Sequence, residues 1–524
     1  MKKNLKYYIS LASLVLAVSV QSCTEKLDLS PENTTTSDVV FSTMEGYRSS
    51  LAKLYISLAT EGNIPSQIVK DGGNTGLLRQ FWNLQCITTD EAGWNFTGDT
   101  DPIGLHQFTW NASTQAVSGA YYKSYYIITI CNNYLQESTD AKLSARGFSE
   151  TEKATIKNYR AEARFLRAYC YWILMDLFGN VPFADESIVV GSGVLPTQIR
   201  QADLFNWLVT ELGALQTDMV AAKTNEYGRA DKAAAQALLA RIYLNAEVYA
   251  GTAKYTEAIA AAKSVIDAGY TLHPKYKELM LGDNHQNTSE NIWTLQFDGL
   301  KTQSYSGTTF LVHAPAGVPG DSSGSNGSWN CMRMTEQFVD KFNSLDLRGQ
   351  FWTNGQQKNM DQLLNAATNG YSSTKFRNKN KAGGLAPNYD ATFASIDFPV
   401  FRTGEMYLIY AEAVVRGGTG GSGETALNYL KALAQRARPT DPNAASVPQM
   451  TLPYIIDERA RELFWEGFRR TDLRRFGQFT TGAYLWAWKG NVRNGRAMDD
   501  HYNLFPIPST DIASNPNIRQ NTGY

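Results

Sequence analysis

The sequence has few cysteines, and none of them stands in a metal-binding motif. Only five of its 524 residues are cysteine, and no two form a Cys-x-x-Cys pair. Cys131 and Cys170 stand among apolar residues in helical patterns. Cysteine in that setting is usually a small buried hydrophobic residue. We interpret Cys86, Cys131, Cys170 and Cys331 in this way.

Excess charge of either sign is also lacking. The formal net charge is −1 at pH 7, so the chain has no overall basic footprint for nucleic acid. The histidines are five in number and include no pair at zinc-ligand spacing, which leaves a zinc enzyme without support. No cofactor is expected, while structural calcium in a loop stays open. Apolar residues make up 43% of the chain, enough for a substantial core in one large domain or in two or three ordinary ones.

Long hydrophobic runs are absent except near the N-terminus. Lysines at positions 2, 3 and 6 precede an apolar run over residues 9–20, which is too short to span a membrane. The run ends Val-Gln-Ser-Cys, which resembles a bacterial lipobox, although Gln21 is an unusual residue at its position. We therefore predict a lipoprotein signal peptide over residues 1–22 and a lipidated, tether-like segment over residues 23–40, acylated at Cys23. An ordinary signal peptide is the alternative.

Helical periodicity dominates the remainder. The clearest stripe lies at residues 152–182, where apolar residues recur at steps of three and four before Gly179 and Pro182 end the helix. Further helices are expected at residues 41–60, 120–136 and 201–222. Two helix–turn–helix pairs, at residues 230–269 and 402–438, alternate large and small residues and resemble tetratricopeptide repeats, which stack to bury a shared core.

A charge-laced pattern over residues 453–477 predicts another helix, half-buried in an ion-pair network. Several helical glutamates there and elsewhere stand beside arginines and are interpreted as structural ion-pair partners. They are Glu162, Glu412, Glu458, Glu462 and Glu466.

Two regions lack helical periodicity, residues 63–118 and 271–397. They are rich in Gly, Asn, Thr and Asp, carry scattered aromatic residues, and contain one strand-like run, ENIWTLQF. Long loops of this kind are usually functional. The string Gly320-Asp-Ser-Ser-Gly324 matches GxSxG, but its flanks are loop-like, which argues against a serine nucleophile.

An ordered set of segments resembles the SusD/RagB family. The set comprises the lipobox cysteine before LDLSP, AEARFLRAYCYWILMDLFGNVP, FPVFRTGEMYLIYAEAVVR, ERARELFWEGFRRTDLRRFG and FPIPSTDIASNPNIRQNTGY. The resemblance implies a mainly α, SusD-like fold, in which tetratricopeptide-like hairpins support a loop-rich binding face with a few short strands. It implies one domain over residues 41–524, with an N-terminal part at about 41–225 and a C-terminal SusD/RagB part at about 270–524.

The same resemblance implies a function. It points to a non-catalytic, lipid-anchored protein exposed on the outer-membrane surface that binds glycan and passes it to a SusC-like TonB-dependent transporter. Family relatives suggest Arg79 and Trp94, with Asn95 and Phe96 beside them, as glycan-binding residues. They also place stacking aromatics in the second loop region, for which we name Tyr305 and Trp329.

Three alternatives stay open at this point. A glycoside hydrolase needs only two well-placed carboxylates, which no motif excludes. RagB-like relatives are linked to peptide uptake, so a peptide cargo is a second alternative. A structural adaptor without a carbohydrate site is the third.

Overall fold

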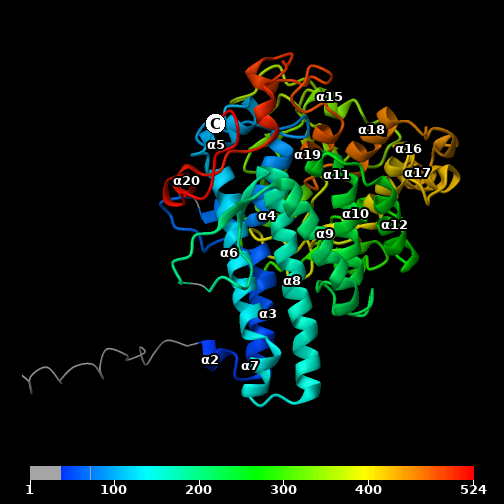
Figure 1. The fold of residues 1–524 in the computed structure, drawn as a ribbon. Coiled ribbons are helices and arrows are strands. Elements are labelled where there is room, and N and C mark those ends of the chain that lie inside the picture. The colour runs from blue at the N-terminus through cyan, green and yellow to red at the C-terminus, as the bar shows by residue number, and fades with distance from the viewer. Residues whose placement is uncertain (1–36, 71, 190) are drawn as a thin grey trace, which may run out of the picture. The chain divides into compact units, whose positions relative to one another are not determined.

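The computed structural model describes residues 37–70, 72–189 and 191–524 (Figure 1). The chain divides into two compact units, residues 1–47 and residues 48–524. In the described part of the first unit, α2 (Ser37–Val40) is a short helix where the sequence predicted the end of an extended tether. The predicted signal peptide and Cys23 lie outside the described residues.

The second unit is mainly helical. Helix α3 (Met44–Ala59) begins in the first unit and continues into the second. The α-helices that follow are α4 (Leu77–Trp82), α5 (Thr100–Gln107), α6 (Gln115–Glu137), α7 (Asp140–Ala145), α8 (Glu150–Phe178), α9 (Gln201–Asp218), α10 (Lys232–Leu244), α11 (Ala246–Ala250), α12 (Tyr255–Asp267), α13 (Gly307–His313), α14 (Gly320–Ser323), α15 (Glu336–Val339), α16 (Thr403–Val415), α17 (Gly423–Ala437), α18 (Leu452–Leu463), α19 (Arg469–Arg475) and α20 (Ser509–Ser514). A π-helical turn, η2 (Asn83–Ile87), continues α4.

Helix α8 confirms the strongest pattern in the sequence. It begins after a capping box, in which the Ser149 side chain accepts from the Glu152 backbone and the Glu152 side chain accepts from the Ser149 backbone. It ends at Gly179, whose φ of 72° suits a residue without a side chain. The apolar stripe is buried from Phe165 to Phe178. The C-terminal half of this helix therefore lies in the core.

The helices of the second unit pack as a stack of neighbours. Helix α6 packs on α8, α8 on α9, α9 on α10, α10 on α12, α12 on α16, and α16 on α17 (Figure 1). The predicted pairs at residues 230–269 and 402–438 are thus α10 with α12 and α16 with α17. Small alanines on α10 and α12, such as Ala237 and Ala262, are fully buried and let these helices approach closely. The mainly α, tetratricopeptide-like prediction is confirmed.

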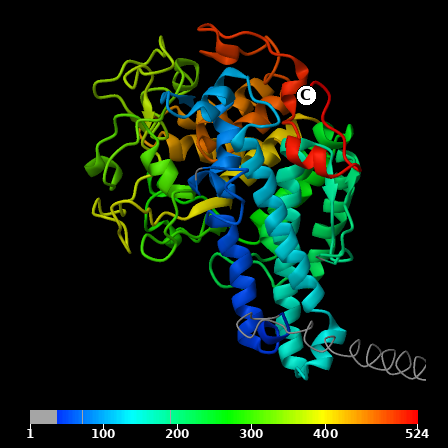
Figure 2. The ribbon, with the colours of Figure 1, turned by 90° about the vertical axis from the view of Figure 1, so that its left-hand side faces the viewer.

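Short antiparallel strand pairs join the loops to this stack. In the described residues they are β1 (Gly93–Trp94) with β5 (Met332–Arg333), β2 (Val181–Phe183) with β3 (Thr197–Ile199), β4 (Asn291–Leu295) with β8 (Phe398–Arg402), and β6 (Phe351–Trp352) with β7 (Ser372–Ser373). Strand β4 is the predicted ENIWTLQF run. The irregular segment over residues 271–397, green to yellow in Figure 2, gathers to one side of the helices.

The helix predicted over residues 453–477 is interrupted, and on this point the sequence prediction is wrong. Helix α18 ends at Leu463 and α19 begins at Arg469. Between them Trp465 takes a φ of 61° and Gly467 a φ of 82°, both outside the helical range. The Trp465 ring is fully buried, and its Nε1 donates to the Glu91 carbonyl. Tertiary packing of this ring thus outweighs a continuous helical pattern.

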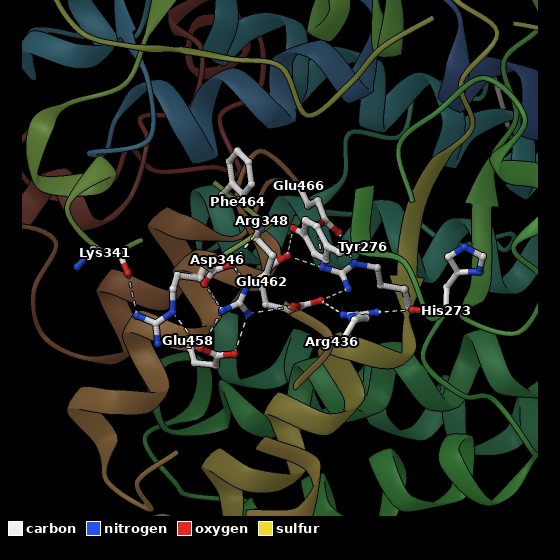
Figure 3. A network of polar contacts seen from close by, with 12 residues as sticks. His273, Tyr276, Lys341, Asp346, Arg348, Arg436, Glu458, Glu462, Phe464 and Glu466 are labelled. Atoms are coloured by element: carbon white, nitrogen blue, oxygen red, sulfur yellow. Dashed lines mark hydrogen bonds and ion pairs between the residues drawn. The ribbon is translucent and has the colours of Figure 1, made fainter. Parts of the chain in front are cut away.

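The charges of α18 enter a buried ion-pair network (Figure 3). Arg348 contacts Glu458 at 2.7 Å and Glu462 at 3.1 Å, and Arg402 contacts Glu462 at 2.6 Å and Glu466 at 2.7 Å. Arg436 also pairs with Glu462. Burial alone raises the pKa of Glu462, but the guanidinium groups of Arg436, Arg402 and Arg348 lower it to about 2. The carboxylates therefore stay charged inside the protein, as predicted.

Two further expectations concern cysteine and membrane spans. All four described cysteines are buried and free, which confirms their interpretation as small core residues. Across the described part of the chain, none of the helices combines the length and apolar character that a membrane crossing requires.

Candidate functional site

Three aromatic rings form one surface of the loop region, which we call the aromatic platform: Tyr305, Trp329 and Phe393. The Tyr305 ring centroid lies 5.1 Å from that of Phe393 and 6.4 Å from that of Trp329. The ring planes are tilted by 58° and 43°, so the platform is curved. Tyr305 is 48% exposed, and the other two rings are half-buried. Exposed rings grouped in this way are uncommon on a surface that binds nothing.

The buried residue His313, at the end of α13, supports the platform from below. Its ring stacks on Trp329 with centroids 4.7 Å apart and planes 12° apart. Its Nδ1 lies 2.6 Å from the Gly327 carbonyl oxygen, and its Nε2 lies 2.8 Å from the Thr392 carbonyl oxygen. The imidazole therefore joins the two loops that carry Trp329 and Phe393.

The Tyr305 backbone is held by Glu61, which follows α3. The Glu61 Oε2 accepts from the Tyr305 amide at 3.2 Å and from the Ser304 hydroxyl at 3.4 Å. Gly307, at the start of α13, has a φ of 62°, and a side chain there would collide with the Phe297 ring. These contacts order the loop and leave the Tyr305 ring at the surface.

Arg79 lies behind this surface. It is carried by α4, is 7% exposed, and places its guanidinium 4.3 Å from the centroid of the Phe310 ring. Phe310 in turn lies 6.5 Å from Trp329, between centroids. The structure thus brings the predicted residues Arg79, Tyr305 and Trp329 together, with Arg79 mostly covered.

Trp94 does not face solvent, contrary to the expectation that it offers a stacking surface. It is 2% exposed in β1, and its Nε1 donates to the Phe96 carbonyl. Phe96, two residues later, is 53% exposed. Strand β1 is buried throughout and ends at Trp94, whereas Phe96 lies beyond the end of the strand. Phe96 is therefore the accessible ring of this segment.

Asn95 uses its amide within the protein. Its Nδ2 donates to the Asn330 carbonyl at 2.9 Å, and its Oδ1 accepts from the Ala366 amide at 2.7 Å. Its backbone amide also donates to the Cys331 carbonyl. These bonds place the segment bearing Phe96 beside the segment bearing Trp329. In this structure Asn95 fastens loops together.

Half-exposed rings backed by a rigid layer suit one kind of ligand. Sugar rings present apolar C–H faces that stack on aromatic side chains and hydroxyls that take hydrogen bonds at the rim. Because the three rings are not coplanar, they suit a curved chain better than a flat one.

The serine motif and the glutamates considered as catalytic candidates in the sequence have structural roles in the folded protein. Gly320–Ser323 is the short helix α14, with no buried strand directly before it, so the GxSxG string is not a nucleophile elbow. The glutamates singled out in the sequence are all ion-paired, for example Glu162 with Arg229 and Glu412 with Arg475 at 2.7 Å. Within the described ranges, His, Cys, Asp and Glu side chains form no group of three that could hold a metal ion.

Phe393, Phe310 and His313 were not assigned to the site from the sequence. Phe393 stands in a polar loop, the same signal that singled out Tyr305, and could have been included on that ground. His313 carries no spacing signal, because its partners are backbone carbonyls of distant loops.

Comparison with known proteins places these observations in a family. The family model described as "SusD family" matches residues 345–524, and the one described as "Starch-binding associating with outer membrane" matches residues 94–270. The starch-binding protein SusD of Bacteroides thetaiotaomicron is 33% identical over 100% of this chain and 99% of its own length. The SusD-like protein P2 of Formosa agariphila is 22% identical over 99% of this chain and all of its own.

Solved structures show the same fold. Surface glycan-binding protein A from Bacteroides fluxus aligns with a TM-score of 0.71 at 22% identity, covering 92% of this chain and 100% of that one. The protein of that name from Bacteroides thetaiotaomicron, solved in complex with laminarihexaose, aligns with a TM-score of 0.67 at 19% identity, covering 91% and 99%. The helical stack of this chain agrees with these solved structures. Together with the two family models and the starch-binding relative, which is 33% identical over the entire chain, it shows that this chain belongs to the SusD family.

Proposed function

We propose that this protein binds glycan on its aromatic platform without cleaving it. The observation that carries the proposal is the group of Tyr305, Trp329 and Phe393, exposed on one surface and backed by buried His313. Starch is the first ligand to test, because the relative that matches over its full length is described as starch-binding. Phe96 is a further candidate contact, Arg79 offers only a small exposed fraction behind Phe310, and Trp94 and Asn95 support their segment from within.

We further propose that the protein acts at the outer membrane, anchored through acylated Cys23, and passes its ligand to a SusC-like TonB-dependent transporter. Support comes from the lipobox-like end of the N-terminal apolar run and from the family description "associating with outer membrane". Metabolic labelling with palmitate tests the anchor. Label on the wild-type protein that disappears in Cys23→Ser supports it, and an unlabelled wild type overturns it.

Affinity electrophoresis in gels containing starch, laminarin or no glycan tests the binding. We expect wild-type protein to be retarded by at least one glycan and the double variant Tyr305→Ala/Trp329→Ala to migrate freely. Two stacking contacts worth about 1–3 kcal/mol each, by analogy with base stacking, correspond to at least a tenfold loss of affinity. Tyr429→Ala is the matched control, because Tyr429 also stacks, at 4.1 Å on Tyr407, but lies on α17.

The same preparations separate the alternatives. Release of reducing sugar at enzymatic rates would establish a glycoside hydrolase. Retention of peptides in place of glycans would establish a RagB-like peptide carrier. Migration unaffected by any glycan, with no retention of peptides, would leave the adaptor role, and the platform assignment would be withdrawn.

A further inference from the structure

A hollow of about 390 Å³ is lined by both polar and apolar groups of the segments next to the platform. Gln296, Lys301, His285, Asn388 and Asp397 are among the residues that line it. Its volume falls in the range of about 300–1,000 Å³ that is usual for small-ligand sites.

The wall of the hollow is rigid. The Asp298 Oδ1 accepts from the amides of Leu300 and Lys301, at 2.9 and 3.0 Å. The Asp298 Oδ2 accepts from the Asn388 Nδ2 at 2.7 Å. The Gly299 amide donates to the Ser395 hydroxyl at 2.9 Å. The turn at residues 298–302 and the segment at 387–397 are thus tied together, and a ligand need not order them.

Asp397 is a buried lining residue, 6% exposed. Its carboxyl accepts from the Phe297 amide at 3.0 Å and from the Tyr227 hydroxyl at 2.8 Å. Burial raises the pKa of Asp397 to about 6. A buried, partly satisfied carboxyl at the base of a hollow accepts readily from a ligand hydroxyl.

The charges of the hollow favour a neutral ligand. Lys301 and His285 are exposed, and the carboxyls of Asp298 and Asp397 belong to the same lining, so the hollow does not hold a cluster of one charge. A phosphate ligand would be repelled by the carboxylates of the lining. A divalent cation would need several carboxylates that make no other contacts. Amide, carboxyl, ammonium and imidazole groups in one small space are the set that binds hydroxyls.

The hollow and the platform share their supporting segments. Tyr305 follows the turn at residues 298–302 by three residues, and Phe393 lies within the segment 387–397. Leu300, 58% exposed, lies within the turn that separates them. We propose that the hollow is a second saccharide site, which takes one neutral sugar ring. The ligand class rests on the function proposed above, whereas the location rests on the hollow itself.

Saturation-transfer difference NMR with maltohexaose and laminarihexaose tests the proposal in three proteins. They are the wild type, the platform variant Tyr305→Ala/Trp329→Ala, and that variant with Gln296→Ala and Lys301→Ala added. Both added positions are exposed, so the fold is expected to survive, as unchanged melting temperatures would show. Lys263→Ala in the platform background is the matched control, because that lysine lies on α12 with its side chain 51% exposed.

We expect saccharide signal to persist in the platform variant and to weaken about 3- to 10-fold when the hollow is altered, the range for one or two lost hydrogen bonds. Signal lost completely in the platform variant, while the wild type binds, would overturn the second site and leave the platform standing. Equal signal from wild type and platform variant, reduced only by the hollow changes, would overturn the platform and leave the second site. Signal insensitive to the hollow changes would also overturn the second site.

Discussion

The ion-pair network and the aromatic platform use polar and apolar groups in opposite ways. In the network around Arg402, charged side chains are almost wholly buried and each guanidinium meets at least two carboxylates. On the platform, large rings remain partly in solvent, while the backbone beneath them is held by His313 and Glu61. The ion-pair network buries its charged groups against one another, whereas the platform leaves large apolar rings partly exposed to solvent.

The difference shows which signal marks a binding site in this protein. The carboxylates of the C-terminal network are each paired with buried arginines inside the protein. The platform rings keep part of their surface in solvent, Tyr305 most of all at 48% exposed. Four tests follow, from the largest expected effect to the smallest.

The network should fail when one shared carboxylate is removed. Glu462→Gln removes a carboxylate that Arg402, Arg436 and Arg348 share, so part of their buried positive charge loses its compensation, and we expect the free energy of unfolding to fall by about 3–5 kcal/mol. Urea denaturation followed by circular dichroism measures it. Asp267→Asn, which removes an exposed pair with Lys263, should cost at most about 1 kcal/mol. Equal losses in the two variants would contradict the network's role.

Acid should remove the stability that the network contributes. The pKa values of Glu458 and Glu462 are each lowered from 4.5 to about 2, against the effect of burial, by neighbouring arginines. A carboxylate with a lowered folded pKa stabilises the protein above its unfolded pKa and loses that contribution as pH falls toward the folded value. We therefore expect the melting temperature to drop between about pH 4.5 and pH 2. A melting temperature that stays constant through this window would be the contrary result.

The platform should loosen when its support is altered. His313→Phe keeps a ring beneath Trp329 but loses both contacts to the Gly327 and Thr392 carbonyls. We expect glycan affinity to fall about 3- to 10-fold, the range for one or two hydrogen bonds, as titration calorimetry would measure. His313→Gln restores a donor and should recover part of the loss. Affinity equal to wild type in His313→Phe would limit this residue to the core.

The smallest effect is expected at the edge of the platform. Phe96→Ala removes a ring that is 53% exposed, so stability should change by less than about 0.5 kcal/mol while affinity falls a few-fold. Leu345→Ala, at a side chain 46% exposed, is the control that should leave affinity unchanged. If both variants bind as well as wild type, the platform does not extend to Phe96.

The scaffold was largely predictable from the sequence, whereas the site was predictable only in part. Helix α8 and the pair α10–α12 follow from apolar periodicity, which local geometry enforces. The interruption of the predicted helix at Trp465 could not be predicted from the sequence, because it depends on contacts with Glu91, far away along the chain. Trp94 and Tyr305 carry similar loop signals, yet the first is buried and the second exposed.

The sequence by itself determined the helical stack, the buried cysteines, the pairing of charge on α18 and the presence of ring-bearing loops. The sequence signal of each is local, although the contacts themselves also join distant segments, such as Arg348 with Glu458. Only the tertiary structure decided which rings face outward and where polar groups enclose a hollow. Those outcomes depend on contacts between loops hundreds of residues apart, such as Asn95 with Asn330, for which the sequence carries no periodic signal.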